Sequence, residues 1–182
     1  MKSSLKAWVL CPLIFVAGAA AASPDAAPLP AGARVQVGFS PGKTAQETVI
    51  SAIRSARSEI LVAAFNFTSK PVAGALAAAA QRGVTVKIVA DAKANDRYTA
   101  ITFLANKGIP VAVNSRYSYM HNKFMVIDGD AVETGSFNYS AGAANRNAEN
   151  VIWLSGVPDV AAQYRQEFSR LWQESEPLPP RY

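Results

Sequence analysis

The feature that most constrains the fold of this 182-residue chain is an alternation of strand-like and helix-like segments between residues 34 and 113. The run VTVKIVAD is apolar on both faces and is typical of a buried strand. Ser69 and Pro71 predict a helix start, as cap and first-turn proline, and a Thr44/Glu47 capping box predicts an earlier one. The expected strands here are 34–39, 60–65, 84–91 and 109–113, and the expected helices are 44–57, 71–82 and 98–107.

After residue 114 the pattern changes to short strands joined by short connections. An Asp128-Gly129-Asp130 turn predicts a hairpin between the first two of these strands. Because β-α units precede a β-rich half, we predict an α/β fold with a mixed, largely parallel β-sheet sandwiched between helices. There is no internal repeat, so we expect one domain per chain. The expected elements of this half are strands 123–127, 131–134 and 150–154 and a closing amphipathic helix at 158–172.

The first residues are expected to be removed from the mature protein. Lys2 and Lys6 precede a short apolar run and then small residues, the pattern of a secretory signal peptide. Removing them leaves 16 basic and 13 acidic residues, a net charge of +3, and removes Cys11, the only cysteine. We therefore expect a periplasmic or secreted protein without disulfide, thiolate chemistry or membrane anchor. The predicted organisation is a signal peptide at 1–22, a flexible lead-in at 23–33, a folded domain at 34–176 and a C-terminal tail at 177–182.

The stretch HNKFMVIDGDAVETGSFN contains the only histidine of the chain, His121. In an extended segment alternate side chains share a face, so His121 and Lys123 are expected to project together. Ser136 and Asn138 have the same spacing after the next strand, and Gly135 permits a close backbone approach there. Two neighbouring strand ends are therefore predicted to present an imidazole, an ammonium, a hydroxyl and a carboxamide to one point.

This set of groups suits a phosphodiester substrate. Lys123, Ser136 and Asn138 can donate hydrogen bonds to the non-bridging oxygens, and a neutral His121 can act as nucleophile. Asp128 has the opposite parity in a straight strand, so we expect it to support the turn or an ion pair rather than contact substrate. One histidine and scattered acids do not supply a metal-ligand set, so no metal or other cofactor is expected.

The pattern H-x-K-x4-D-x6-G-S-x-N resembles the signature of the phospholipase D superfamily, and it is most similar to small exported bacterial endonucleases of the Nuc type. The similarity runs from Val35 to the last helix. It implies a phospholipase D-like nuclease domain and a covalent phosphohistidine formed without a metal. It also implies that Glu149, in NAEN, orients the imidazole of His121.

Several other residues are candidates for substrate binding. Arg116 could pair with a neighbouring phosphate, and Tyr117 or Tyr119 could stack on an unpaired base, although a polar loop explains them as well. Arg146 offers another cation. Lys93 and Arg97 follow the carboxyl end of a strand and are further candidates for ligand binding, although helix capping or a solvated surface charge explains them at least as well.

One stretch imitates a different chemistry. GFSPGKT, at 38–44, lies between a strand and a helix like a phosphate-binding P-loop. That motif needs four residues between its glycines, whereas here there are three, and Pro41 removes an amide that would wrap the phosphates. We interpret it as a turn and a helix cap.

We predict a metal-independent, sequence-non-specific endonuclease that hydrolyses DNA, with RNA as an alternative substrate. Cleavage without sequence specificity is expected because no segment resembles a base-reading helix. The alternative is a phospholipase D-type hydrolase of phospholipid or cardiolipin. A nucleic-acid-binding module without catalytic activity is less consistent with the motif.

In-line displacement places the leaving oxygen opposite the attacking nitrogen, so one imidazole cannot both attack phosphorus and protonate the leaving oxygen. Larger members of the family carry two motifs per chain, so we expect a symmetric homodimer that pairs two copies of His121. Glu149 or Tyr119 as the acid within one subunit is the alternative.

Overall fold

The computed structural model describes residues 28–95 and 99–181, so the expected signal peptide, Arg97 and Tyr98 lie outside the described residues. The strands are β1 (Arg34–Ser40), β2 (Glu59–Ala64), β3 (Thr85–Asp91), β4 (Val111–Asn114), β5 (Lys123–Ile127), β6 (Ala131–Gly135), β7 (Glu149–Ser155) and β8 (Glu176–Pro177). The helices are α1 (Thr44–Ser55), α2 (Lys70–Gln81), α3 (Ala100–Asn106), α4 (Ala141–Asn145) and α5 (Pro158–Gln173). In the described part of the chain, no helix is long and apolar enough to cross a bilayer.

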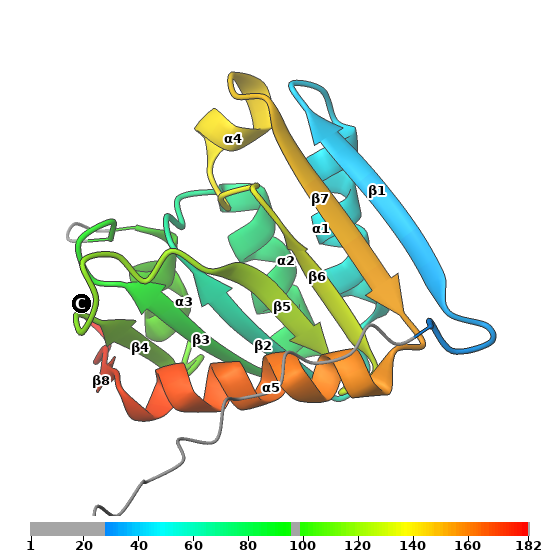
Figure 1. Cartoon of the computed structure of the whole chain (residues 1–182). Helices are drawn as coiled ribbons and strands as arrows, with labels where there is room; N and C mark the ends of the chain where they lie inside the picture. Colours follow the sequence, from blue (N-terminus) through cyan, green and yellow to red (C-terminus); the bar gives the residue numbers. More distant parts are fainter. Residues whose placement is uncertain (1–27, 96–98, 182) are drawn as a thin grey trace, which may run out of the picture.

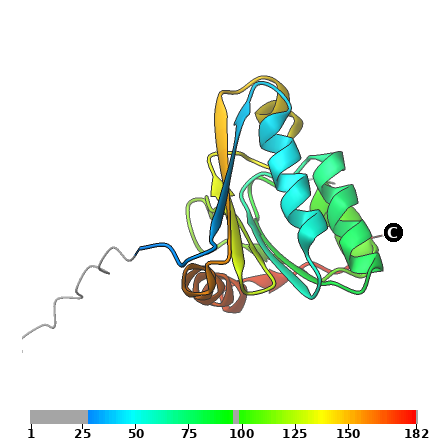
Figure 2. The same ribbon diagram turned by 90° about the vertical axis from the view of Figure 1, so that its right-hand side faces the viewer.

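The eight strands form one sheet in the order β1-β7-β6-β5-β2-β3-β4-β8, with helices on both faces (Figure 1). Helices α1, α2 and α3 cover one face and α5 covers part of the other (Figure 2). The predicted α/β class and single mixed sheet between helices are therefore confirmed. Strand β8 begins at the last residue of the expected domain and pairs with β4, so the chain after α5 rejoins the sheet.

The expectation of a largely parallel sheet is corrected by the strand pairing. Only β2–β3 and β3–β4 are parallel, and the other five pairings are antiparallel. The helix-linked strands β1 to β4 do point in one direction, as β-α units require. However, β5, β6 and β7 are inserted between β1 and β2 by antiparallel pairing, which separates β1 from the strand that follows it in the chain.

Most local predictions are confirmed within one or two residues. The Ser69 side chain accepts a hydrogen bond from the amide of Val72 and caps α2 as expected. The Thr44/Glu47 capping box is wrong, because the Thr44 hydroxyl bonds instead to the amide and carbonyl of Phe39 at the end of β1. Helix α4 and strand β8 were not predicted, since five and two residues carry no usable periodicity.

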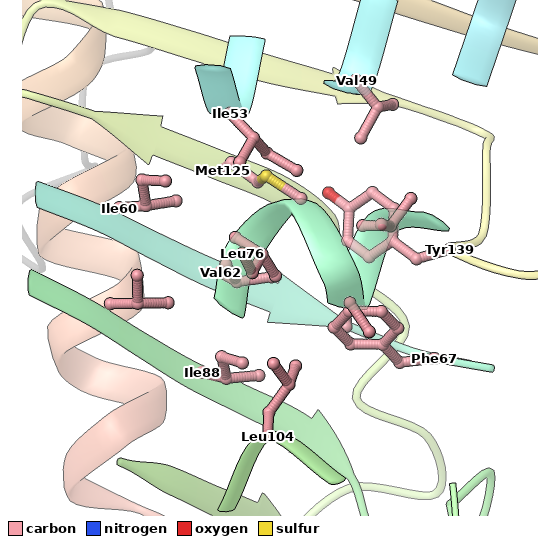
Figure 3. Packing of buried hydrophobic residues seen from close by; sticks show 14 of the residues in the cluster. Val49, Ile53, Ile60, Val62, Phe67, Leu76, Ile88, Leu104, Met125 and Tyr139 are labelled. Atoms are coloured by element: carbon pink, nitrogen blue, oxygen red, sulfur yellow. The ribbon is translucent and has the colours of Figure 1, made fainter. Parts of the chain in front are cut away.

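A main hydrophobic core fills the space between the sheet and helices α1 to α3 (Figure 3). Buried among its apolar side chains is a carboxyl group, that of Glu133 on β6, which is 1 % exposed. The hydroxyl of the fully buried Tyr139 donates to its Oε2 at 2.7 Å. Burial raises the pKa of Glu133 to about 8, although the Tyr139 hydrogen bond opposes the shift. Glu133 is therefore protonated in the folded protein at neutral pH.

At the far end of β5 from Lys123, Asp128 makes the turn into β6. Its carboxylate accepts hydrogen bonds from the amides of Arg57, Ser58 and Glu59 and from the Ser58 hydroxyl. Burial raises the pKa of Asp128, but these donors outweigh burial and the net shift is downward. Asp128 and Gly129 have φ angles of 54° and 68°, as a tight hairpin turn requires. The side chain thus joins the β5–β6 hairpin to the connection between α1 and β2.

The buried carboxyl predicts a stability that falls as pH rises. Between its ordinary pKa of 4.5 and the raised value of about 8, Glu133 is ionised in the unfolded chain and protonated in the folded one. The free energy of unfolding therefore falls with pH in this window, by up to about 1.4 kcal/mol per pH unit. Glu133→Gln keeps an acceptor for Tyr139 and removes this slope. Urea unfolding at pH 5, 6.5 and 8 measures it, and parallel curves for variant and wild type would contradict it.

The Asp128 turn predicts the opposite pH dependence. Asp128→Asn puts an amide group where four donors converge, so the free energy of unfolding at pH 7 should fall by about 1–3 kcal/mol. The stabilisation by Asp128 is present above its ordinary pKa of 3.8 and is lost as pH falls through the lower folded value. The difference between variant and wild type should therefore shrink as the pH falls below 3.8. Chemical denaturation at pH 7 and pH 3 tests this, and an unchanged stability at pH 7 would show that the turn holds without the carboxylate.

Candidate active site

The predicted catalytic side chains gather at one edge of the sheet because the inserted strands alternate in direction. Strand β5 is antiparallel to β2 and β6, so its start lies beside the ends of both strands. Strand β7 is antiparallel to β6 and starts at the same edge. His121 and Lys123 are at the start of β5, Ser136 follows β6, and Glu149 begins β7.

His121 and Lys123 contact each other directly, as their spacing predicts. The Lys123 ammonium lies 3.2 Å from Nδ1 of His121 and donates to the His121 carbonyl oxygen at 2.7 Å. Desolvation lowers the pKa of Lys123, and the negative charge of Glu149 partly opposes this shift. When the ammonium donates to Nδ1, the neutral imidazole carries its proton on Nε2.

Ser136 and Glu149 form the second part of the site. The Ser136 hydroxyl donates to Oε2 of Glu149 at 2.5 Å and accepts from the amide of Asn150 at 3.1 Å. The side chain of Asn147 donates to Oε1 of Glu149 at 2.9 Å. In the described part of the chain, the carboxylate is bonded to Ser136 and Asn147 and not to His121. The expected direct orientation of the imidazole by Glu149 is therefore absent from this arrangement, and the carboxylate acts on Lys123 through its charge.

Gly135 has a role in the backbone. A Cβ atom on this residue would lie 2.2 Å from the carbonyl oxygen of Asn150, so a larger residue would push β7 away. The predicted close approach is thus to β7, and it sets Ser136 beside Glu149. Asn138 follows, and its buried Oδ1 has no hydrogen-bond partner among the described residues.

Two residues at the end of β2 were missed by sequence reasoning. The Phe65 ring lies 4.4 Å from the His121 ring and 5.3 Å from the Lys123 ammonium. Next to it, Asn66 has a buried Oδ1 without a partner in the described part of the chain. The available signal was their place at the carboxyl end of a strand, where α/β sheets bind ligands.

Asp128 belongs to the same sequence motif but not to this edge. It follows the last residue of β5 and lies five positions after Lys123, a distance of about 17 Å along an extended strand. Its predicted supporting role in the turn matches the observed hydrogen bonds.

A groove of about 400 Å³ opens beside His121. Its lining residues are Tyr117, Tyr119, Met120, His121, Asn122, Arg170 and Leu171. The Tyr117 hydroxyl donates to Glu174 at 2.6 Å and is bonded by Arg170, so this ring is part of a fixed wall. Arg116 lies 3.7 Å from Glu174 and is largely exposed. Arg146 follows α4 outside the groove lining.

The groove is not the largest hollow of the protein. A hollow of about 460 Å³ lies between α2 and α3 and contains none of the predicted site residues. In residues 28–95 and 99–181, no group of three or more histidine, cysteine, aspartate or glutamate side chains is placed to hold a metal ion. The predicted site residues that meet at this edge offer an imidazole, an ammonium, a hydroxyl and a carboxylate.

Comparisons with known proteins agree with this geometry. Residues 49–172 match the family model described as cardiolipin synthase, PLD-like domain. The chain is 37% identical over 117 residues to the mitochondrial cardiolipin hydrolase of Xenopus tropicalis, covering 62% of this chain and 54% of the relative. It is 32% identical over 136 residues to a phospholipase D of Rickettsia bellii, covering 74% of this chain and 67% of the relative. The chain thus spans about half the length of the cardiolipin hydrolases that it matches.

Among solved structures, Nuc from Salmonella typhimurium, a phospholipase D family member, is 36% identical with a TM-score of 0.79. The match covers 81% of this chain and 99% of Nuc. NucT from Helicobacter pylori, at 23% identity and a TM-score of 0.73, shares the fold over 80% of this chain and 99% of its own. The family match, the arrangement of the motif residues and the full-length similarity to Nuc lead to one conclusion. This chain belongs to the phospholipase D superfamily and is of the Nuc type.

Proposed function

We propose that this protein is a metal-independent, sequence-non-specific endonuclease that hydrolyses phosphodiester bonds of DNA, with RNA as a related substrate, through a covalent phosphohistidine. The observation that carries the proposal is the direct contact of His121 with Lys123 at the edge where Ser136 and Glu149 also lie. The similarity to Nuc over nearly the whole of that chain supports nucleic acid as the substrate.

The proposed reaction has two displacements. In the first, Nε2 of His121 attacks phosphorus, the bond to the leaving oxygen breaks, and a general acid protonates that oxygen. In the second, a base takes a proton from water, the water oxygen attacks phosphorus, and the phosphorus–nitrogen bond breaks. Lys123, Ser136 and Asn138 stabilise the charge on the non-bridging oxygens in both transition states.

The two roles of histidine need different protonation states. A nucleophilic Nε2 requires a neutral imidazole with its proton on Nδ1, and a general acid requires the imidazolium, with protons on both nitrogens. The contact of Nδ1 with the Lys123 ammonium places the single proton on Nε2 instead. Both roles therefore need Nδ1–H and an acceptor for it in place of the Lys123 ammonium. We propose that the active site is shared across a homodimer, in which one His121 attacks while the partner subunit's His121 protonates the leaving oxygen.

An uncovered apolar sheet face supports this assembly. Val35, Val37 and Phe39 on β1 are 51%, 49% and 60% exposed, and Ile152 and Leu154 on β7 lie beside them on the same face. Val132 on β6 pairs with Leu154 and packs among the apolar side chains under α5, so this strip lies on the face that α5 covers. However, α5 contacts the strands from β6 to β4 in the sheet order and leaves β1 and β7 open (Figure 2). The strip ends at Phe39, opposite Asn150, next to the catalytic edge. A second copy on this face would bury the strip and bring two catalytic edges together.

A second candidate function is hydrolysis of phospholipid or cardiolipin, because several relatives are mitochondrial cardiolipin hydrolases. The same displacement mechanism serves a lipid phosphodiester.

Export to the periplasm or medium, which the N-terminal sequence predicts, is part of the proposal and would bring the enzyme to extracellular nucleic acid.

Parallel assays with plasmid DNA and cardiolipin vesicles, each with and without EDTA, test the substrate and the mechanism. We expect nicking of DNA that persists in EDTA, since imidazole and ammonium groups carry the chemistry. His121→Ala should lower the rate by at least about 10³-fold, and wild type quenched in an alkaline denaturant should carry an adduct on His121 that is stable in base and lost in acid. Lipid turnover with inert DNA would favour the second candidate, and activity abolished by EDTA would overturn the metal-free mechanism.

Mixed dimers test the shared site. When equal amounts of wild type and His121→Ala exchange subunits at random, about one quarter of the dimers keep both histidines. A shared site then predicts about one quarter of the activity of the same total concentration of wild type, whereas independent sites predict about one half. Val37→Asp should weaken the dimer and lower activity at dilute protein, and Lys70→Asp, an exposed change on α2, serves as the matched control. Activity that stays with a monomer by sedimentation would exclude the shared site.

A further inference from the structure

Tyr119 is an exposed aromatic residue next to the nucleophile. It is 59 % exposed and lines the same groove as His121. The next residue, Met120, is buried, so the chain is anchored immediately beside Tyr119. An exposed ring at a catalytic groove is available to a ligand in a way that a buried ring is not.

The Tyr119 ring is held in a fixed orientation. Phe65 contacts it edge to face, with ring centroids 5.6 Å apart and planes at 86°. The Lys93 ammonium lies 5.6 Å from its centroid and is itself anchored to the carbonyl oxygen of Ser118 at 3.1 Å. A ring that is already ordered loses little conformational entropy when a ligand stacks on it. Because the residue is 59 % exposed in spite of both contacts, part of the ring surface is left for a planar ligand.

Phe65 connects this ring to the catalytic edge. Its ring also contacts His121, at 4.4 Å between centroids, so the rings of His121, Phe65 and Tyr119 form a continuous series. The Tyr119 ring consequently lies within about 10 Å of the imidazole, the range of a base attached to a nucleotide at the reacting phosphate. Lys93, with two further donors on its ammonium, can also bind the next phosphate.

Tyr117 does not share these properties. Its hydroxyl is bonded to Glu174 and Arg170, and its ring packs against the apolar side chains buried between α5 and the sheet. Of the two candidate stacking residues, Tyr117 and Tyr119, the structure therefore leaves Tyr119 as the ring that can accept a base.

We propose that Tyr119, held by Phe65 and Lys93, is a stacking subsite for an unpaired nucleobase beside the reacting phosphate, and that it gives the enzyme a preference for single-stranded nucleic acid. This inference rests on the proposed nuclease function. In a duplex both faces of each base are covered by its neighbours, so a base can reach Tyr119 only after it has left the stack, at a cost of free energy. A single strand presents the face directly, and because every base has one, the preference carries no sequence requirement.

The test compares the wild-type protein with Tyr119→Ala, Tyr119→Leu and Tyr119→Phe on a labelled 20-mer, its duplex and bis(p-nitrophenyl) phosphate. Wild type should cleave the single strand with a kcat/KM about 10-fold or more above that for the duplex. Tyr119→Ala and Tyr119→Leu should lower kcat/KM for the single strand about 10-fold, mainly through KM, and reduce the strand preference. Tyr119→Phe keeps the ring and should recover most of the loss. An abasic nucleotide next to the cleaved bond should impair wild type but add nothing to the Tyr119→Ala defect.

Equal losses on all three substrates in Tyr119→Ala would overturn the stacking subsite and indicate a structural role instead. Equal cleavage of single and double strands by wild type would also overturn it. Either result leaves the nuclease proposal standing, because that proposal fails only if wild type leaves both oligonucleotides intact.

Discussion

The insertion of three antiparallel strands between β1 and β2 is the constraint on which the rest of the molecule depends. Because β5 and β7 run against β2 and β6, strand starts and strand ends alternate along one edge of the sheet. Residues far apart in sequence, such as Phe65, His121, Ser136 and Glu149, therefore meet at that edge without any long excursion of the chain. Gly135 keeps the insertion tight, since its missing side chain lets β7 approach β6.

Much of this was predictable from local sequence, and the failures have a common cause. The strand of Lys123–Ile127 and the hairpin at Asp128 followed from apolar runs and turn residues, which are local properties. The contact of His121 with Lys123 followed from their spacing. Strand order, by contrast, is set by long-range pairing, so β-α rhythm alone overstated the parallel content of the sheet. The Thr44 cap failed for a similar reason, because the Thr44 hydroxyl accepts from the amide of Phe39 on β1 and donates to its carbonyl instead of accepting from a helix amide.

The residues of the active site also divide into those that local sequence predicts and those that only the fold reveals. Histidine, lysine and serine were recognisable because their chemistry is distinctive and their spacing regular, whereas Glu149 was recognisable only through the family resemblance. Phe65 was not, because an aromatic residue at a strand end is ordinarily packing, and only the fold places its ring against the imidazole. The partner of Glu149 also depends on three-dimensional detail. Its carboxylate is satisfied by Ser136 and Asn147, which leaves the acceptor needed by a nucleophilic His121 to come from outside the arrangement seen here.

Strand β5 has two ends with different duties. Its first residue supports chemistry, whereas Asp128, after its last residue, gathers the amides of the α1–β2 connection. The eighteen-residue signature therefore runs from the catalytic edge along β5 to a structural turn and back along β6 to Ser136, rather than forming one catalytic cluster. For protein engineering this is an advantage: the hairpin end can be redesigned for thermal tolerance, with turn geometry as the criterion, while the groove end is varied for selectivity. The rigid apolar strand between them insulates each set of changes from the other.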